Sequence, residues 1–404
     1  MFRAFALLAP SMTDPAVPPE HLRRSLSNRH LQLIAIGGAI GTGLFMGSGK
    51  TISLAGPSIV LVYLIIGAML FFVMRAMGEL LLSNLEYKSF IDCSTDLLGH
   101  WAGFFCGWTY WFCWIITGFG LVAWGFTSPS GHQASFANLY NDGGMFPMGM
   151  AGFFAGFQIA VFAFVGIELV GTTAAETADP ERNLPKAINS IPVRIIVFYV
   201  LALIAIMAVT PWREVVPGKS PFVELFVLAG IPAAASLINF VVLTSATSSA
   251  NSGIFSTSRM MYGLAEERHA PGFFARLSRA AVPARGLVFS CICLLLGTML
   301  IYLIPNLVTA FTLVTTLAAV LFMFVWSLIL CSYIVYRRRR PQLHVASKFK
   351  MPGGVFMCGV CLAFFGFVLV LLTLQPDTLY ALAISPLWFL LLGLGYAAKR
   401  LIER

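Results

Sequence analysis

Charged residues are scarce in this sequence. Only 11% of the 404 residues are Asp, Glu, Lys or Arg, whereas 58% are hydrophobic, and the mean hydropathy is +0.85. Soluble domains carry about 25% charged residues. A water-soluble fold of this composition would lack the polar side chains needed to cover its surface. The composition therefore excludes a soluble globular protein and indicates an integral membrane protein.

Alternation of apolar and polar residues with a period of two is also missing, which argues against a transmembrane β-barrel. Backbone groups in lipid must be paired inside the protein, so we expect an all-α membrane protein. A spanning helix needs roughly 20 mostly apolar residues. We expect a transmembrane domain over 31–398 between cytoplasmic tails at 1–30 and 399–404. The ten candidate spans are 31–48, 58–82, 101–126, 149–171, 190–210, 231–258, 286–304, 308–336, 355–374 and 380–398.

Positive charge is nearly absent from one side of the predicted membrane. If both termini are cytoplasmic, 23 of the 26 Lys and Arg residues fall in cytoplasmic segments, and only Lys50, Arg213 and Lys219 fall outside. An excess of Lys and Arg in cytoplasmic loops sets the orientation of a membrane protein. We therefore expect both ends in the cytoplasm. The positions of the basic residues that give the net charge of +9 are explained by this orientation in the lipid bilayer. We therefore predict no nucleic-acid partner.

No segment has the spacing of a metal or catalytic site. Cys358-x-x-Cys361 lies in an apolar run without a second pair or a nearby His, which argues against zinc. The six His residues fall in loops or near helix ends, and no nucleophile and base stand together. The glycine-rich stretch 37–49 is not a phosphate loop, because Leu44 stands where the motif needs glycine. We predict no metal, no cofactor and no enzymatic activity.

Two predicted spans contain residues that disfavour an unbroken helix. The first holds four glycines between positions 37 and 43, and each glycine in a helix interior costs about 1 kcal/mol against alanine. The second holds Gly166 and then Glu168 in an apolar run, where a carboxylate costs about 2.5–3.5 kcal/mol on insertion scales. Taken singly, each has another interpretation: close helix packing through small residues, or a structural hydrogen bond made by Glu168.

Taken together, paired interrupted helices are typical of secondary transporters built from inverted repeats. Free amides at the N-terminus of a half-helix favour a carboxylate. Carbonyl groups freed at the other interruption can hold a cation or an ammonium group. A ligand that carries both charges fits both interruptions, so the pattern predicts a transporter of amino acids.

Three stretches carry a resemblance to a known family. They are 23–87, beginning RRSLSNRHLQLIAIGGAIGTGLFMGSGK; 164–195, beginning FVGIELVGTTAAETADPERNLPK; and 244–265, TSATSSANSGIFSTSRMMYGLA. They resemble the amino acid transporter branch of the amino acid–polyamine–organocation permeases, over about residues 21–400. The resemblance implies an inverted-repeat bundle of twelve helices. It also implies proton-coupled import of small neutral amino acids, such as D-serine, D-alanine and glycine, across the bacterial inner membrane.

The resemblance also implies a site when its motifs are carried over. The substrate carboxylate would meet the backbone at Ala39, Ile40, Gly41, Thr42 and Gly43. The amino group would meet carbonyls around Phe162, Ala163 and Val165, next to Gly166, and Phe162 and Phe164 would cover the ligand. Glu168 would serve proton coupling or gating. The implied partners are an amino acid, a proton and the lipid bilayer.

Two further features match the family pattern. For Glu79, near the inner end of the second span, we favour a structural role at the membrane interface over one in coupling. The stretch 243–258 holds nine Ser or Thr residues. Ser248 or Ser252 would line the transport path, or the stretch would serve helix packing.

The sequence departs from the family pattern near residue 119. The whole chain has ten predicted helices, whereas the family has twelve. Residues 107–118 resemble part of the family's third helix, and 120–131 resemble the end of its fifth, so the segment between is missing. No Lys or Arg lies between Lys88 and Arg182, so a lysine that many members carry on the fifth helix has no counterpart. Two interpretations stay open: an active permease with a shortened first repeat, and a transport-incompetent permease that inserts and at most binds amino acids.

Overall fold

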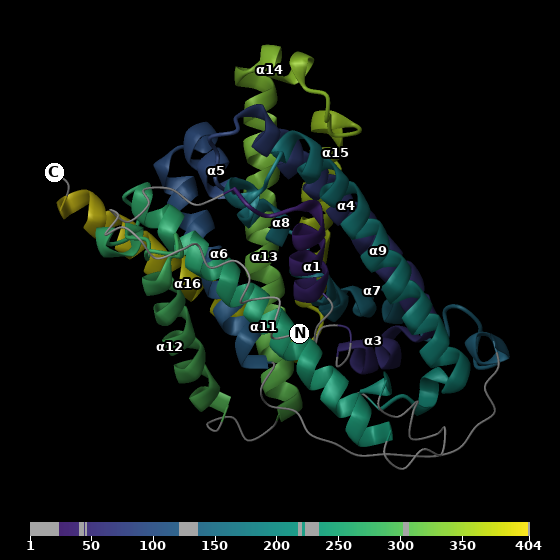
Figure 1. Ribbon diagram of the computed structural model, residues 1–404. Helices are drawn as coiled ribbons and strands as arrows, with labels where there is room; N and C mark the ends of the chain where they lie inside the picture. The colour runs from purple at the N-terminus through teal and green to yellow at the C-terminus, as the bar shows by residue number, and fades with distance from the viewer. Residues whose placement is uncertain are drawn as a thin grey trace.

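The structure is a computed structural model that describes residues 24–39, 44, 47–120, 136–216, 220–222, 234–301 and 307–402. Over these residues it is a bundle of helices (Figure 1), and its single β contact is an isolated bridge between Leu26 and Thr177. The principal helices are α1 (Asn28–Ala39), α3 (Gly47–Ala55), α4 (Ile59–Ser83), α5 (Phe90–Leu98), α6 (His100–Gly120), α7 (Gly149–Ala160), α8 (Leu169–Thr172), α9 (Pro180–Val209), α11 (Ala234–Glu266), α12 (Ala284–Ile301), α13 (Leu307–Arg339), α14 (Pro341–Ala346), α15 (Gly354–Leu372) and α16 (Pro376–Ile402).

Six helical segments within the described ranges are long and apolar enough to cross a membrane. They are Gly47–Ser83, Gly149–Thr172, Pro180–Val209, Thr309–Arg339, Gly354–Leu372 and Pro376–Leu401. Each coincides with one of the ten predicted spans. The other four predicted spans coincide with α1, α6, α11 and α12. Each of these helices borders residues that lie outside the described ranges.

Helix α13 runs through the middle of the bundle, with α14 at one end (Figure 1). It packs on α4, α5, α6, α15 and α16, while α4 lies along α9 and α6 lies along α11. Glycines allow close approach at these contacts. A Cβ atom on Gly67 of α4 would lie 2.4 Å from Ile196 of α9, and one on Gly107 of α6 would lie 2.5 Å from Leu264 of α11. This packing holds α1, α7, α8 and α9 around one region of the core.

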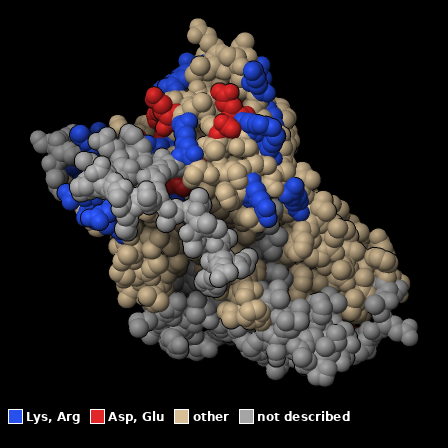
Figure 2. Space-filling model, viewed as in Figure 1, with Lys and Arg blue, Asp and Glu red and all other residues tan. Residues whose placement is uncertain are grey.

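Charged side chains gather around α14 and the neighbouring helix ends (Figure 2). A second group of Lys and Arg lies at the left of that view, near the C-terminus, and the described surface toward the bottom carries no charged side chains. We call the end of the bundle around α14 the α14 end. The ion pairs among the residues described there include Arg259–Glu176 at 2.6 Å, Arg340–Asp96 at 2.8 Å and the close contact of Lys88 with Glu266.

The chain before α1 is also tied to the rest of the bundle. The Leu26 N–H donates to the Glu176 carbonyl at 2.8 Å, and the Ala178 N–H donates to the Leu26 carbonyl at 2.9 Å. The Arg24 guanidinium donates to the Leu85 carbonyl at 2.7 Å. Because these bonds fix the start of α1, they also fix the direction in which its other end reaches into the core.

Candidate functional site

The second predicted interruption lies in the middle of the Gly149–Thr172 span. Helix α7 ends at Ala160 and continues as one turn of 3-10 helix over Val161–Phe164, after which Val165 is extended. Gly166 then has a φ of +109°, a backbone conformation that side-chain-bearing residues rarely adopt. Helix α8 begins at Leu169. The prediction of an interrupted helix here is confirmed.

Glu168 turns back onto this interruption. Both of its carboxylate oxygens lie 3.2 Å from the Gly166 N–H, which donates to them, and the side chain is fully buried. The carboxylate therefore satisfies an amide that the broken helix leaves without a partner.

The first predicted interruption is only partly described. Helix α1 ends at Ala39 and α3 begins at Gly47. Of the residues predicted to meet a carboxylate, Ala39 is buried, at 4% exposure, while Ile40, Gly41, Thr42 and Gly43 lie outside the described residues. The structure thus places one of these five residues, at the end of α1.

Tyr199 of α9 joins the end of α1 to the interruption after α7. Its hydroxyl lies 2.7 Å from the Ala39 carbonyl oxygen and 2.6 Å from the Ala163 carbonyl oxygen, and its side chain is fully buried. The carbonyls at the ends of two helical segments therefore converge on one point in the core. The role of Tyr199 was not predictable from the sequence, because an aromatic residue in an apolar helix gives no local sign of partners 160 and 36 positions away.

Three aromatic rings, including that of Tyr199 itself, pack against one another here. The Phe164 ring lies 5.2 Å from the Tyr199 ring, and the Tyr63 ring lies 5.5 Å from Phe164 and 5.8 Å from Tyr199, measured between centroids. Such tilted and edge-on contacts are favourable for aromatic side chains. They leave the Tyr199 ring little freedom to turn unless Phe164 moves with it.

Buried polar groups lead away from Glu168. Trp326 of α13 and Tyr110 of α6 lie beside its carboxylate. The Ser256 hydroxyl of α11 lies 3.2 Å from the Tyr110 hydroxyl and 2.8 Å from that of Thr172. These side chains come from four helices and lie next to one another in the core. The arrangement is favourable because an isolated polar group in an apolar core is costly.

Glu79 has the surroundings of a structural residue. It is fully buried, and it accepts hydrogen bonds from the Tyr333 hydroxyl at 2.9 Å and the Met351 N–H at 2.7 Å. The His344 ring also contacts its carboxylate. These partners tie α4 to α13, α14 and the chain before α15.

The serine stretch of α11 faces α1. A Cβ atom on Gly37 would lie 3.2 Å from the Ser248 hydroxyl oxygen and 3.9 Å from that of Ser252. The contact supports the helix-packing interpretation of these two residues.

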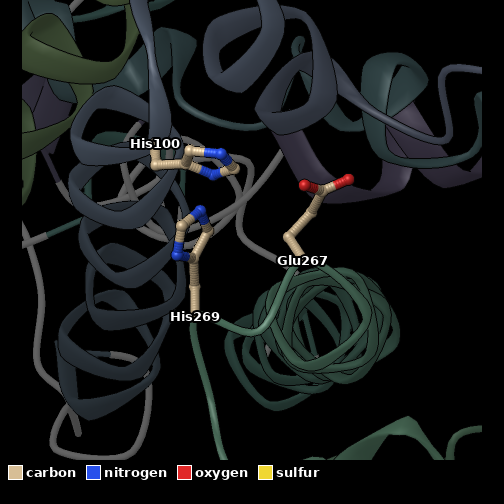
Figure 3. Close-up of side chains that lie close together, drawn as sticks. All are labelled: His100, Glu267 and His269. Atoms are coloured by element: carbon tan, nitrogen blue, oxygen red, sulfur yellow. The ribbon is translucent and has the colours of Figure 1, made fainter. Parts of the chain in front are cut away.

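A cluster of potential metal ligands lies at the start of α6 and just after α11 (Figure 3). Donor atoms of His100, Glu267 and His269 all lie within 4.8 Å of one another. The Lys399 ammonium lies 3.0 Å from His269 Nδ1 and can donate to it. That bond leaves the ring proton on Nε2, the nitrogen that faces His100 in Figure 3, and it keeps a positive charge beside the ring. Because both effects oppose a bound cation, we assign no metal to this cluster.

The same contacts predict a pH dependence of stability. Burial, with Lys399 and His100 nearby, lowers the pKa of His269 to about 4 from 6.5. The unfolded chain then binds more protons than the folded one between about pH 4 and 6.5, so stability is lost as the pH falls through this window. We expect His269→Gln to flatten the fall of the thermal unfolding midpoint between pH 6.5 and 4.

Lys399→Gln serves as the matched variant for this prediction, because it removes the nearby charge and keeps the imidazole. It should raise the pKa of His269 in the folded protein toward 6.5, which narrows the pH window and makes the total loss of stability smaller. Identical pH profiles for the wild type and both variants would contradict the assignment.

The fold and the interrupted helix together define the class of protein: a polytopic helical membrane permease. Residues 30–123 and 117–400 match the amino acid permease family, and the chain belongs to this family. The predicted fold class, an all-α membrane bundle of the permease type, is thereby confirmed.

Several named relatives span nearly the whole chain. The D-serine/D-alanine/glycine transporter of Escherichia coli K12 is 62% identical over 447 residues, which cover 95% of each chain. The amino-acid permease AapA of Bacillus subtilis is 46% identical, covering 97% of this chain and 98% of its own. The DL-alanine permease SerP2 of Lactococcus lactis is 35% identical, covering 95% and 97%. A solved structure, an inward-facing conformation of Mhp1, aligns at 17% identity with a TM-score of 0.39, covering 98% and 95%.

The matches also bear on the gap predicted near residue 119. The two family segments meet and overlap at residues 117–123. The alignment to the Escherichia coli transporter is 447 positions long, so at least 43 of its positions have no counterpart among the 404 residues here. Both observations agree with an internal gap beside the end of α6.

Proposed function

We propose that this protein is a secondary transporter that imports small neutral amino acids, such as glycine, D-alanine and D-serine, together with protons. One observation of the structure carries the proposal: the end of α1 and the interruption after α7 present carbonyl groups to a common point beside Tyr199. The 62% identical relative named for D-serine, D-alanine and glycine supports the choice of substrates.

In this proposal the two charges of the substrate meet different parts of the site. Its carboxylate is bound by backbone groups of 39–43, and its ammonium group by carbonyls around Phe162, Ala163 and Val165. Gly166 shapes the turn, and Phe162 and Phe164 cover the ligand. The rings of Phe164, Tyr63 and Tyr199 lie close together, which favours substrates with small side chains.

Glu168 is proposed to carry the coupling proton. A buried carboxylate in a membrane span is commonly part of a proton path. Its neighbours Tyr110, Ser256 and Thr172 offer hydroxyl groups along which a proton can move toward the α14 end. We place that end in the cytoplasm of a bacterial inner membrane, because its surplus of Lys and Arg is what the positive-inside rule requires.

The second candidate function is a transport-incompetent permease that inserts in the membrane and at most binds amino acids. It is favoured by the missing segment beside α6, which removes positions that the relatives possess. The two candidates differ in whether the bundle can change its conformation around the site.

Uptake of radiolabelled glycine and D-alanine separates them. We expect a strain that lacks its own glycine and D-alanine permeases to accumulate both when it expresses this chain, and we expect a protonophore to abolish the accumulation. No uptake at good membrane expression, with glycine still bound by the purified protein, would favour the second candidate. Grafting the missing segment from the Escherichia coli relative would then be expected to restore uptake.

A further inference from the structure

We propose that the Tyr199 hydroxyl occupies the place of the substrate ammonium group in the empty site, and that substrate binding displaces it. This inference rests on the proposed function and adds a residue to it. Tyr199 lies on α9, outside both interrupted helices. It would set affinity by competing with the ligand for the carbonyls of Ala39 and Ala163.

A phenol and an ammonium group differ in the number of hydrogens that they can donate. The Ala39 and Ala163 carbonyl oxygens lie 2.7 and 2.6 Å from the same phenol oxygen, and a phenol has one hydrogen to donate. One strong bond therefore serves two acceptors. An ammonium group has three N–H donors and a positive charge, so it can bond to both carbonyls at once, and charge-assisted bonds are the stronger ones.

The burial of these carbonyls explains why a bond from the Tyr199 hydroxyl stabilises the site when substrate is not bound. An unpaired carbonyl in an apolar core costs free energy, and the Tyr199 side chain that bonds to both carbonyls is fully buried. The Tyr199 hydroxyl keeps the end of α1 joined to the interruption while no substrate is bound. The ammonium group then replaces the bonds from Tyr199 to these two carbonyls with bonds of its own.

The ring contacts couple this exchange to Phe164. The Tyr199 and Phe164 rings are 5.2 Å apart, and Phe164 follows directly after Ala163 in the chain. In this proposal a shift of the Tyr199 hydroxyl off Ala163 also shifts Phe164, the residue proposed to cover the ligand. Ligands without an ammonium group lack the donors needed for this exchange, and their binding is disfavoured.

Tyr199→Phe tests the inference, because it removes the competing hydroxyl and keeps the ring. We expect the KM for D-alanine uptake to fall about two- to tenfold, the range that one net hydrogen bond corresponds to. Tyr336→Phe is the matched control. Its hydroxyl is also buried, but it has no hydrogen-bond partner among the described residues, and it lies near the end of α13 at the α14 end, outside the proposed site. It should leave KM unchanged.

A KM that does not fall in Tyr199→Phe overturns the inference. A raised KM in Tyr199→Phe would make the hydroxyl a direct ligand of the substrate. An unchanged KM with less folded protein would make it a structural link only. If the wild type takes up no amino acid, the proposed transport function fails. The inference about Tyr199 is then tested by measuring the Kd of glycine for the purified full chain and for Tyr199→Phe. A lower Kd in Tyr199→Phe supports competition, whereas an equal or higher Kd, or no binding by the wild type, refutes it.

Discussion

Replacing Glu168 with glutamine is expected to abolish the protonophore-sensitive accumulation of D-alanine. Glutamine has nearly the same shape, and its amide oxygen can still accept the Gly166 N–H that the carboxylate oxygens accept at 3.2 Å. It cannot take up or release a proton at physiological pH. Accumulation should therefore fall to the level of passive equilibration, while exchange of external for internal D-alanine persists. Uptake and counterflow in proteoliposomes, with and without an imposed proton gradient, measure the two activities.

Glu79→Gln is the matched control for this experiment. Glu79 is an equally buried carboxylate, but its partners Tyr333 and the Met351 N–H belong to the α14 end. Its replacement is expected to lower the amount of folded protein and to leave the remaining uptake proton-driven. Proton-driven accumulation at the wild-type level in Glu168→Gln would remove Glu168 from coupling and leave it the structural role of bonding to Gly166.

Gly166→Ala is expected to lower uptake at least about tenfold. The φ of Gly166 is +109°, and a residue with a Cβ atom held in so sparsely populated a conformation costs of order 1–3 kcal/mol. Relaxing that strain shifts the peptide that donates to Glu168 and carries the neighbouring carbonyls of the proposed ammonium site. Initial rates of D-alanine uptake and the thermal unfolding midpoint of the purified variant test this expectation.

The control for that variant is Gly263→Ala. Gly263 is buried in α11, has no positive φ, and a Cβ atom there would meet no atom within 4 Å. Its replacement favours the helix slightly and should keep uptake near the wild-type rate. Near-normal uptake by Gly166→Ala would show that transport does not need this turn.

Much of the fold followed from composition and short patterns. Six predicted spans coincide with helices that are long and apolar enough to cross a membrane, because the requirement for about 20 apolar residues is local. The interruption at 161–168 was predictable for the same reason, since Gly166 and Glu168 disfavour a continuous helix through their own backbone and charge. The family motifs are also contiguous runs, so they identified the permease before any contact was known.

The partners of these residues were not predictable. Nothing around Tyr199 in the sequence shows that its hydroxyl meets Ala39 and Ala163, and the His100 cluster joins segments about 170 residues apart. Glu79 was expected to be structural, but its bonds to Tyr333, His344 and Met351 span 254 to 272 positions.

The sequence by itself determined that this protein is a helical permease with a broken helix and a buried acid, because hydrophobicity, glycine conformation and the cost of a charge in lipid are properties of short segments. Only the tertiary structure decided that the broken helix meets the end of α1 at one phenol. That meeting depends on how α1, α7 and α9 pack together, and packing is set by side-chain shapes from distant parts of the chain acting at once.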